Sequence, residues 1–207
     1  MQAEWLNDDD DDGEEGKEAD GKKKRPAIND RLLDARTMII AEEVSDVLYR
    51  KVATMLTLLE RKDKAAPITV FVNSPGGSAD SGFAIYDLFR FSPCPIITVA
   101  NGVVASSAVL IFLGGEAGKR VTMQNARFLL HQPSTATRGQ ASDIDITAKE
   151  ISKIRRRYNE IVAESTGRDF ALVEKDSDRD FWLSAREAVD YKLAVKIVDK
   201  RSDLDAL

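Results

Sequence analysis

Strand-like and helix-like segments alternate along this 207-residue chain. The strand-like segments are short and rich in β-branched residues: DARTMIIAEEV, PITVFVN, CPIITVAN and RVTMQNARFLLHQP, the last of which holds two strands. The segments between them are helix-like: SDVLYRKVATMLTLLERKDK, GSADSGFAIYDLFRFS and VVASSAVLIFLGG. Alternation of this type is typical of a parallel sheet whose strands are joined by crossover helices. The sequence therefore predicts an α/β fold.

The longest helical pattern covers residues 142–165 and has an apolar stripe opposite a charged face. Ser142 with Asp145 resembles a capping box at its start, and Gly167 is a C-terminal stop signal. Ser45 is the expected N-cap of an earlier helix. A helix as long as this on a small domain often packs against another subunit. The alternative is an ordinary surface helix that packs on its own core.

The net charge of the chain is concentrated at its N-terminus. Residues 1–25 carry ten acidic and five basic residues, which account for the whole formal net charge of −5. A run of five aspartates repels itself and has nothing to bury, so residues 1–26 are expected to form a disordered tail. The alternative is an interaction arm. A tail whose two halves neutralise each other gives poor evidence for a nucleic-acid partner, and none is expected.

The remaining chain is long enough for one globular domain. With 43% hydrophobic residues it can bury one substantial core, which we expect over residues 27–200, followed by a flexible tail over residues 201–207. No apolar stretch reaches 18 residues, and the start MQAEWLNDDD lacks the regions of a signal peptide. We therefore expect a cytoplasmic protein with no membrane partner. The single cysteine, Cys94, allows neither an internal disulfide nor a cysteine cluster for zinc, so no metal site is expected.

A glycine-rich turn, NSPGGSADSG, follows a predicted strand and opens a predicted helix. Pro75 fixes its own φ, while Gly76 and Gly77 permit backbone conformations closed to other residues and allow another group to approach the main chain. An exposed N–H beside the positive end of a helix suits an anion. The spacing of a phosphate-binding loop is absent. The alternative is a tight strand-to-helix turn without a ligand.

Two adjacent serines lie in the apolar run GVVASSAVLIFLGG, which ends at Gly114 and Gly115. A serine in the first turn of a helix that begins near Ala105 has its hydroxyl at the positive helix end, and the next backbone N–H has no partner within the helix. That N–H and one from the glycine turn could hold a developing oxyanion. The alternative is that the serines only cap the helix.

The chain contains one histidine, His131, at the end of a predicted strand. A hydroxyl is a poor nucleophile unless a base accepts its proton, and the base works best when a carboxylate orients it. His131 is therefore the one conventional base available to a serine. The alternative is a polar residue at a strand boundary. Carboxylates are too numerous for their spacing to single out a partner.

Three stretches together resemble one family. They are NSPGG, then ASSA with HQP 25 residues later, and then EKDSDRDFWLSAREAVDYKLA. In this order and spacing they are similar to the Clp protease proteolytic subunit family (ClpP), and the likeness runs from about Met38 to Val198. The resemblance implies a ClpP/crotonase-like α/β fold with repeated β-β-α units and a long protruding handle helix, which matches residues 142–165.

The resemblance also implies roles for individual residues. Ser106 matches the nucleophile, His131 the general base and Asp180 the carboxylate that orients the base. Gly77 and Ser107 match the backbone N–H donors of the oxyanion hole. The activity implied is that of a serine endopeptidase that cuts unfolded polypeptides into short peptides.

Further expectations concern substrate and partners. An extended peptide would add as a strand beside the four residues Gly76, Gly77, Ser134 and Thr135. Family members stack two seven-membered rings around a proteolytic chamber, with the segment 138–140 beside the contact between rings. An AAA+ Clp unfoldase feeds the chamber and uses ATP, so no cofactor is expected in this chain. Phe71 and Phe91 match the aromatic residues of the docking pocket for the unfoldase.

The sequence departs from the family pattern in places. Ser107 and Ala108 stand where the family usually has methionine and glycine, and Lys192 replaces a glycine suited to a left-handed helix end. The N-terminus has the acidic tail in place of an apolar axial loop. These departures motivate an alternative: a weakly active or regulatory subunit of a ring shared with a paralogous subunit. An acyl-CoA enzyme of the crotonase fold is a further alternative, and a relative of signal-peptide peptidase would need a lysine base and a membrane anchor.

Overall fold

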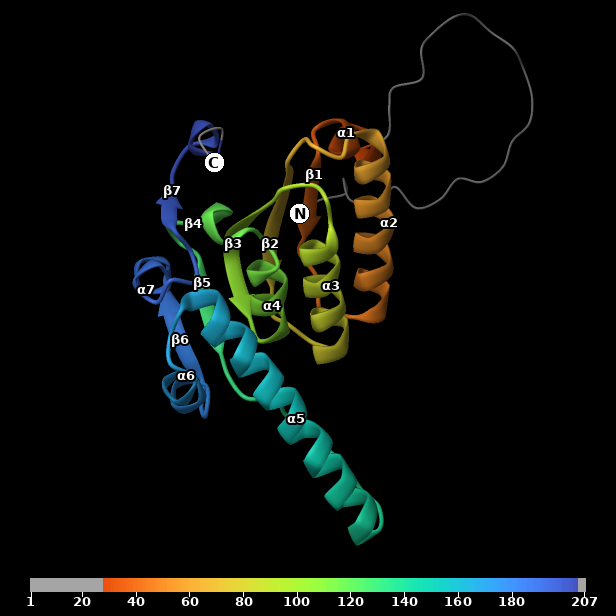
Figure 1. Ribbon diagram of the computed structural model, residues 1–207, viewed down its shortest axis with the longest axis vertical. Coiled ribbons are helices and arrows are strands. Elements are labelled where there is room, and N and C mark those ends of the chain that lie inside the picture. Colours follow the sequence, from red (N-terminus) through yellow and green to blue (C-terminus); the bar gives the residue numbers. More distant parts are fainter. Residues whose placement is uncertain (1–27, 205–207) are drawn as a thin grey trace, which may run out of the picture.

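The computed structural model describes residues 28–204 (Figure 1). Its seven strands form one sheet in which β1, β2, β3, β4 and β7 are neighbours in that order, while β5 pairs with β3 and β6. All of these pairings are parallel except that of β5 with β6. The strands are Thr37–Ile40 (β1), Ile68–Ser74 (β2), Ile96–Ala105 (β3), Arg120–Met123 (β4), Arg127–Leu130 (β5), Phe181–Ser184 (β6) and Lys196–Val198 (β7). The predicted α/β fold with a mainly parallel sheet is confirmed.

The helices connect these strands. They are Ile28–Asp34 (α1), Asp46–Lys62 (α2), Ala79–Phe91 (α3), Ser107–Leu113 (α4), Ala141–Thr166 (α5), Phe170–Asp176 (α6) and Ala185–Asp190 (α7), with two short 3-10 helices, Ala117–Lys119 (η1) and Arg201–Asp203 (η2). Helix α3 packs against both α2 and α4. All seven residues of α4 are buried, because this helix lies in the centre of the main apolar core. A buried α4 holds the chain around it in a fixed position.

Strand β3 divides the sheet into two branches. Its first half pairs with β4, from Thr98 with Arg120, and its last three residues pair with β5, from Val103 with Arg127. Between the two halves lies Gly102, whose φ of +96° suits glycine. The side chain of Asn73 stabilises this bend, because its Oδ1 accepts a hydrogen bond of 3.0 Å from the N–H of Val103. The second branch carries β5 and β6 away from β4 and β7.

Helix boundaries follow the local signals in two of three cases. The Ser45 side chain accepts a bond from the Leu48 N–H and caps α2, and Gly167 ends α5 with a left-handed φ of +67°, as predicted. The capping box of Ser142 with Asp145 is wrong. Helix α5 begins one residue earlier than expected, after the extended Gln140, so Ser142 already lies inside the first turn and cannot cap it.

Helix α5 packs against the rest of the chain with only one of its ends. Residues 141–150 are exposed apart from Thr147, which is partly buried, whereas the buried residues of the helix begin at Tyr158. In Figure 1 the first half of the helix extends away from the body. The alternative of an ordinary surface helix on its own core therefore does not describe this half.

A flexible tail was expected over residues 201–207, but the structure describes residues 201–204 as an ordered part of the fold. Residues 201–203 form η2, and Leu204 is 7% exposed because it packs in a small apolar cluster with β3, β4 and β7. Asp203 stabilises the turn, since its carboxylate accepts bonds of 2.9 Å from the N–H groups of Asp199 and Lys200. The predicted N-terminal tail over residues 1–26 and residues 205–207 lie outside the described part of the chain.

Lys192, the lysine that follows α7, has a φ of +68°, which is the left-handed region. Replacing it with glycine is expected to raise the free energy of unfolding by about 0.5–1 kcal/mol, because the Cβ that disfavours this conformation is removed. The measurement is chemical denaturation followed by circular dichroism. Lys192→Ala is the control, because it removes the same charge but keeps the Cβ; an equal gain from both variants would contradict the backbone explanation.

Candidate active site

Three strand ends converge at the predicted catalytic residues. Ser106 directly follows β3, His131 directly follows β5 and Asp180 directly precedes β6. Strand β5 brings them together because it pairs with β3 on one side and with β6 on the other, where Leu130 is opposite Phe181. The Ser106 N–H also donates to the Leu129 carbonyl at 3.0 Å. Residues far apart in the sequence are thus brought together by strand pairing.

Ser106 has an unusual backbone conformation, with φ +55° and ψ −126°. The sequence suggested that it lies in the first turn of the helix, but it lies just before α4. Its side chain makes no capping hydrogen bond. The hydroxyl of Ser107 is buried and has no hydrogen-bond partner among the described residues. The serines therefore do not cap the helix through their side chains. A strained serine between a strand and a helix is the geometry that presents a nucleophile in α/β-hydrolases.

His131 and Asp180 face each other without a hydrogen bond. The distance from His131 Nδ1 to Asp180 Oδ1 is 3.7 Å, which is longer than a hydrogen bond. The Asp180 side chain is 68% exposed and that of His131 is 26% exposed. Among residues 28–204, no hydrogen bond joins Ser106 Oγ to His131. Hydrogen bonds between catalytic groups are often long in the absence of substrate, so this arrangement is compatible with a base that is oriented when substrate binds.

The glycine turn lies directly against Ser106. A Cβ built on Gly76 would be 2.6 Å from the Ala105 carbonyl oxygen and 2.7 Å from Ser106 Cβ, so only glycine fits there. Gly77 has a φ of +146°, and a Cβ on it would lie 2.4 Å from the Val44 carbonyl oxygen. Neither the Gly77 N–H nor the Ser107 N–H has an acceptor within the part of the chain that the structure describes. Two free donors therefore lie near Ser106.

A hollow of about 250 Å³ contains most of the predicted site. Six of the eight predicted residues line it: Gly77, Ser106, Ser107, His131, Ser134 and Thr135. Gly76 lies behind the backbone of Ser106, and Asp180 lies beside His131 outside the lining. The opposite wall is mainly apolar and is formed by α3, α4 and α5 through Phe83, Leu110, Ile151, Ile154 and Tyr158. The hollow can therefore receive an apolar group next to the Ser106 hydroxyl.

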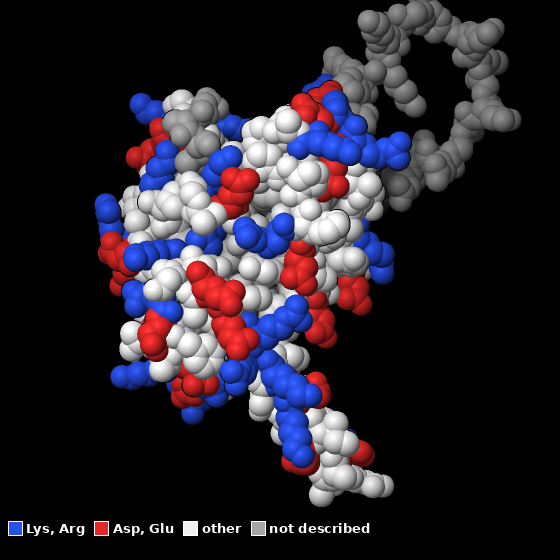
Figure 2. Space-filling view, viewed as in Figure 1, with Lys and Arg blue, Asp and Glu red and all other residues white. Residues whose placement is uncertain are grey.

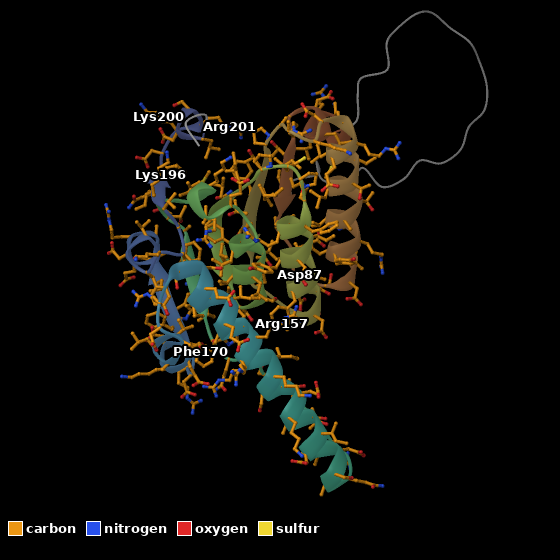
Figure 3. The ribbon with its side chains drawn as sticks, viewed as in Figure 1. Asp87, Arg157, Phe170, Lys196, Lys200 and Arg201 are labelled. Carbon is orange, nitrogen blue, oxygen red and sulfur yellow. The ribbon has the colours of Figure 1, made fainter. Side chains whose placement is uncertain are left out.

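Helix α5 contacts this site in ways that the sequence did not reveal. The Tyr158 hydroxyl donates a hydrogen bond of 3.4 Å to the Ser106 carbonyl, and burial raises the pKa of this phenol, which keeps its proton. Arg157 lies 4.4 Å above the ring of Phe83 and forms an ion pair of 3.4 Å with Asp87 of α3 (Figure 3). The packed end of α5 is thus attached to the wall of the hollow.

The two aromatic residues predicted to form a docking pocket lie apart in the fold. Phe71 and Phe91 line two separate hollows of one subunit, one beside β7 and one on α3, so they form no common pocket within a single chain.

Acidic and basic side chains are interspersed on the face shown in Figure 2. Among residues 28–204, no helix is long and apolar enough to span a membrane, and no group of three or more metal-ligating side chains occurs.

Replacing Gly76 with alanine is expected to slow the reaction of Ser106 with a fluorophosphonate by at least about a hundredfold, because the new methyl group would displace the Ser106 backbone. The rate of labelling, measured by intact-protein mass spectrometry, tests this. Gly118→Ala is the matched control, since a Cβ at Gly118 would meet nothing within 4 Å. Equal labelling rates for the two variants would show that the turn does not position the serine.

Comparison with known proteins identifies the family. The Clp protease family model matches residues 20–201. The ATP-dependent Clp protease proteolytic subunit 2 of Treponema denticola is 42% identical over 86% of this chain and 89% of its own length, and that of Gluconobacter oxydans is 43% identical over 92% and 87%. A mutant of ClpP1 from Listeria monocytogenes has a similar structure, with a TM-score of 0.80 and 38% identity over 86% of this chain and 99% of that one. The resemblance seen in the sequence is confirmed, and the chain belongs to the Clp protease family.

Proposed function

We propose that this chain, a serine peptidase of the Clp protease family, cuts peptide bonds with Ser106, His131 and Asp180. The observation that carries the proposal is the convergence of three strand ends on these residues beside two free backbone donors. His131 accepts the proton of the Ser106 hydroxyl as its oxygen attacks the carbonyl carbon of the substrate. The N–H groups of Gly77 and Ser107 stabilise the negative charge that forms on the carbonyl oxygen.

The same groups complete the reaction. His131 then gives its proton to the leaving amine, and the C–N bond breaks to leave an acyl group on Ser106. A water molecule then attacks the acyl carbon while His131 takes one of its protons, the bond from the acyl carbon to Ser106 Oγ breaks, and His131 returns the proton to that oxygen. Asp180 holds the imidazole in the correct orientation and stabilises its charged form. No step requires a cofactor held by this chain.

Substrate is proposed to bind as an extended strand between the glycine turn and the segment after His131. Gly76 and Gly77 offer main-chain groups on one side, and Ser134 and Thr135 offer them on the other, where the chain adopts no regular structure. Main-chain hydrogen bonds provide affinity with little dependence on sequence. The apolar wall of the hollow favours an apolar side chain at the cut bond.

We further propose that the chain assembles into stacked seven-membered rings and receives unfolded polypeptides from an AAA+ Clp unfoldase, which is the component that uses ATP. Helix α5 supports this, because its first half is exposed and carries Ile144 and Ile146, which are 42% and 59% exposed. Contact with another subunit would bury these side chains.

A second candidate function is that of a subunit that becomes active only beside a paralogous subunit. The gap of 3.7 Å between His131 and Asp180 favours it, because the base is not yet oriented in the single chain. Native mass spectrometry and peptide hydrolysis by the purified chain separate the two candidates. A homogeneous double ring of this chain alone that digests peptides would exclude the second.

The test of the proposed chemistry uses three substitutions. Wild type is expected to hydrolyse a short fluorogenic peptide and to be labelled by a fluorophosphonate, whereas Ser106→Ala and His131→Ala abolish both reactions. Asp180→Asn should lower the turnover number by about 10³–10⁴, because the imidazole loses its orientation. An assembled wild-type ring that neither cuts the peptide nor reacts with the probe would contradict the proposal.

A further inference from the structure

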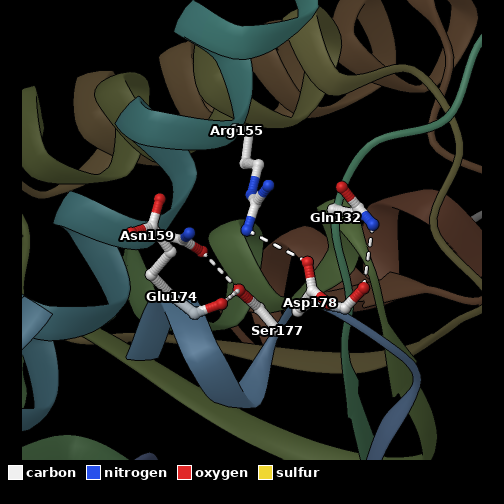
Figure 4. Close-up of polar contacts among 6 residues, drawn as sticks. All are labelled: Gln132, Arg155, Asn159, Glu174, Ser177 and Asp178. Carbon is white, nitrogen blue, oxygen red and sulfur yellow. Dashed lines mark hydrogen bonds and ion pairs between the residues drawn. The ribbon is translucent and has the colours of Figure 1, made fainter. Parts of the chain in front are cut away.

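The loop that carries Asp180 is anchored to the rest of the chain two residues before it. Asp178, two residues earlier, is bonded from two directions (Figure 4). Its carboxylate forms an ion pair of 3.3 Å with Arg155 of α5, and its backbone carbonyl accepts a hydrogen bond of 2.8 Å from the side chain of Gln132. Gln132 directly follows His131. The loop is therefore attached both to helix α5 and to the segment of the proposed base.

The preceding residue is anchored as well. Ser177 is fully buried, and its hydroxyl donates a hydrogen bond of 2.9 Å to the Asn159 side chain, which lies one turn after Arg155 on α5. Two consecutive residues of the loop are thus held by one face of the helix. Arg155 Nε and Asn159 Nδ2 are buried without a partner in the described part of the chain, which lowers stability. Stability alone is therefore a poor explanation for this arrangement.

Asp180, in contrast, has little to hold it. Its side chain is 68% exposed and makes no hydrogen bond with any residue from 28 to 204; its carboxylate lies 3.7 Å from Nδ1 of the His131 imidazole. The backbone is fixed on both sides of this pair. On one side Leu130 is paired with Phe181 in the sheet, and on the other Gln132 is bonded to Asp178. His131 and Asp180 thus lie between two fixed connections.

From this arrangement we infer that Arg155, Asp178 and Gln132 form a latch that positions Asp180 against His131. The inference rests on the proposed function, because it assigns positioning residues to that reaction. None of the three residues lines the hollow beside Ser106. They act by fixing the separation between the two backbone segments that carry the base and its carboxylate. When the ion pair is lost, the loop gains freedom, and the carboxylate spends less time where it can orient the imidazole.

The principal test is Arg155→Gln, with Asp178→Asn as its partner variant. Each is expected to lower the turnover number for a short peptide by about tenfold with the KM changed less than about twofold, because the loss concerns orientation and not binding. Arg155→Lys, which retains the charge, should restore most of the activity. Arg156→Gln is the matched control: it removes the same charge from the next residue, whose partner is Glu160 on the exposed side of α5.

A double-mutant comparison distinguishes positioning from a general structural effect. In the background of Asp180→Asn, Arg155→Gln should cause no further loss, since there is no carboxylate left to position; the two losses would multiply if the ion pair only supported the fold. Native mass spectrometry and thermal unfolding confirm that each variant forms the same particle. If Arg155→Gln does not assemble, Gln132→Ala provides the same test from the other side of the latch.

The outcomes separate this inference from the proposed function. A wild-type ring without peptidase activity or fluorophosphonate labelling would overturn the proposed function. A labelled, active wild type together with Arg155→Gln, Asp178→Asn and Gln132→Ala variants as active as Arg156→Gln would overturn the latch alone. Tenfold losses that disappear in the Asp180→Asn background would support it.

Discussion

The pairing of β5 with both β3 and β6 is the constraint on which the site depends. Each of these strands ends or begins at one of the three proposed catalytic residues, so the register of the two ladders decides whether the residues meet. A slip of one residue in β5 would turn His131 to the opposite face of the sheet. The four residues of β5 include Phe128 and Leu130, which are fully buried, and this burial fixes the register.

The backbone around Ser106 is strained, and the surrounding structure maintains that strain. A non-glycine residue with positive φ costs about 1–3 kcal/mol. Helix α4, which follows Ser106, is fully buried, and the Leu129 carbonyl accepts a hydrogen bond from the Ser106 N–H. Gly76 occupies a position where any side chain would collide with Ser106. The glycine turn thus has a steric role in addition to the electrostatic role proposed for it. The conformation also explains why a helix predicted from Ala105 begins two residues later.

Local chemistry was readable from the sequence, and contacts between distant segments were not. Ser45 and Gly167 were predicted correctly because a cap and a stop depend on neighbouring residues. The prediction that Ser142 caps α5 was wrong because the helix already begins at Ala141, and the spacing of polar residues cannot reveal this. The proximity of His131 and Asp180 was expected only from the family resemblance. The ion pair of Arg155 with Asp178 joins a helix face to a loop, and no periodic pattern marks it.

The attachment of α5 by one end makes the helix a lever. An α-helix rises about 1.5 Å per residue, so the ten largely exposed residues at its start form an arm of about 15 Å. A stiff rod held at one end converts sideways displacement of its tip into tilt at its base. The base of this rod carries Arg155, Tyr158 and Asn159, each bonded to a segment of the site. Mechanical load on the tip is therefore transmitted to Ser106 and to the loop that carries Asp180.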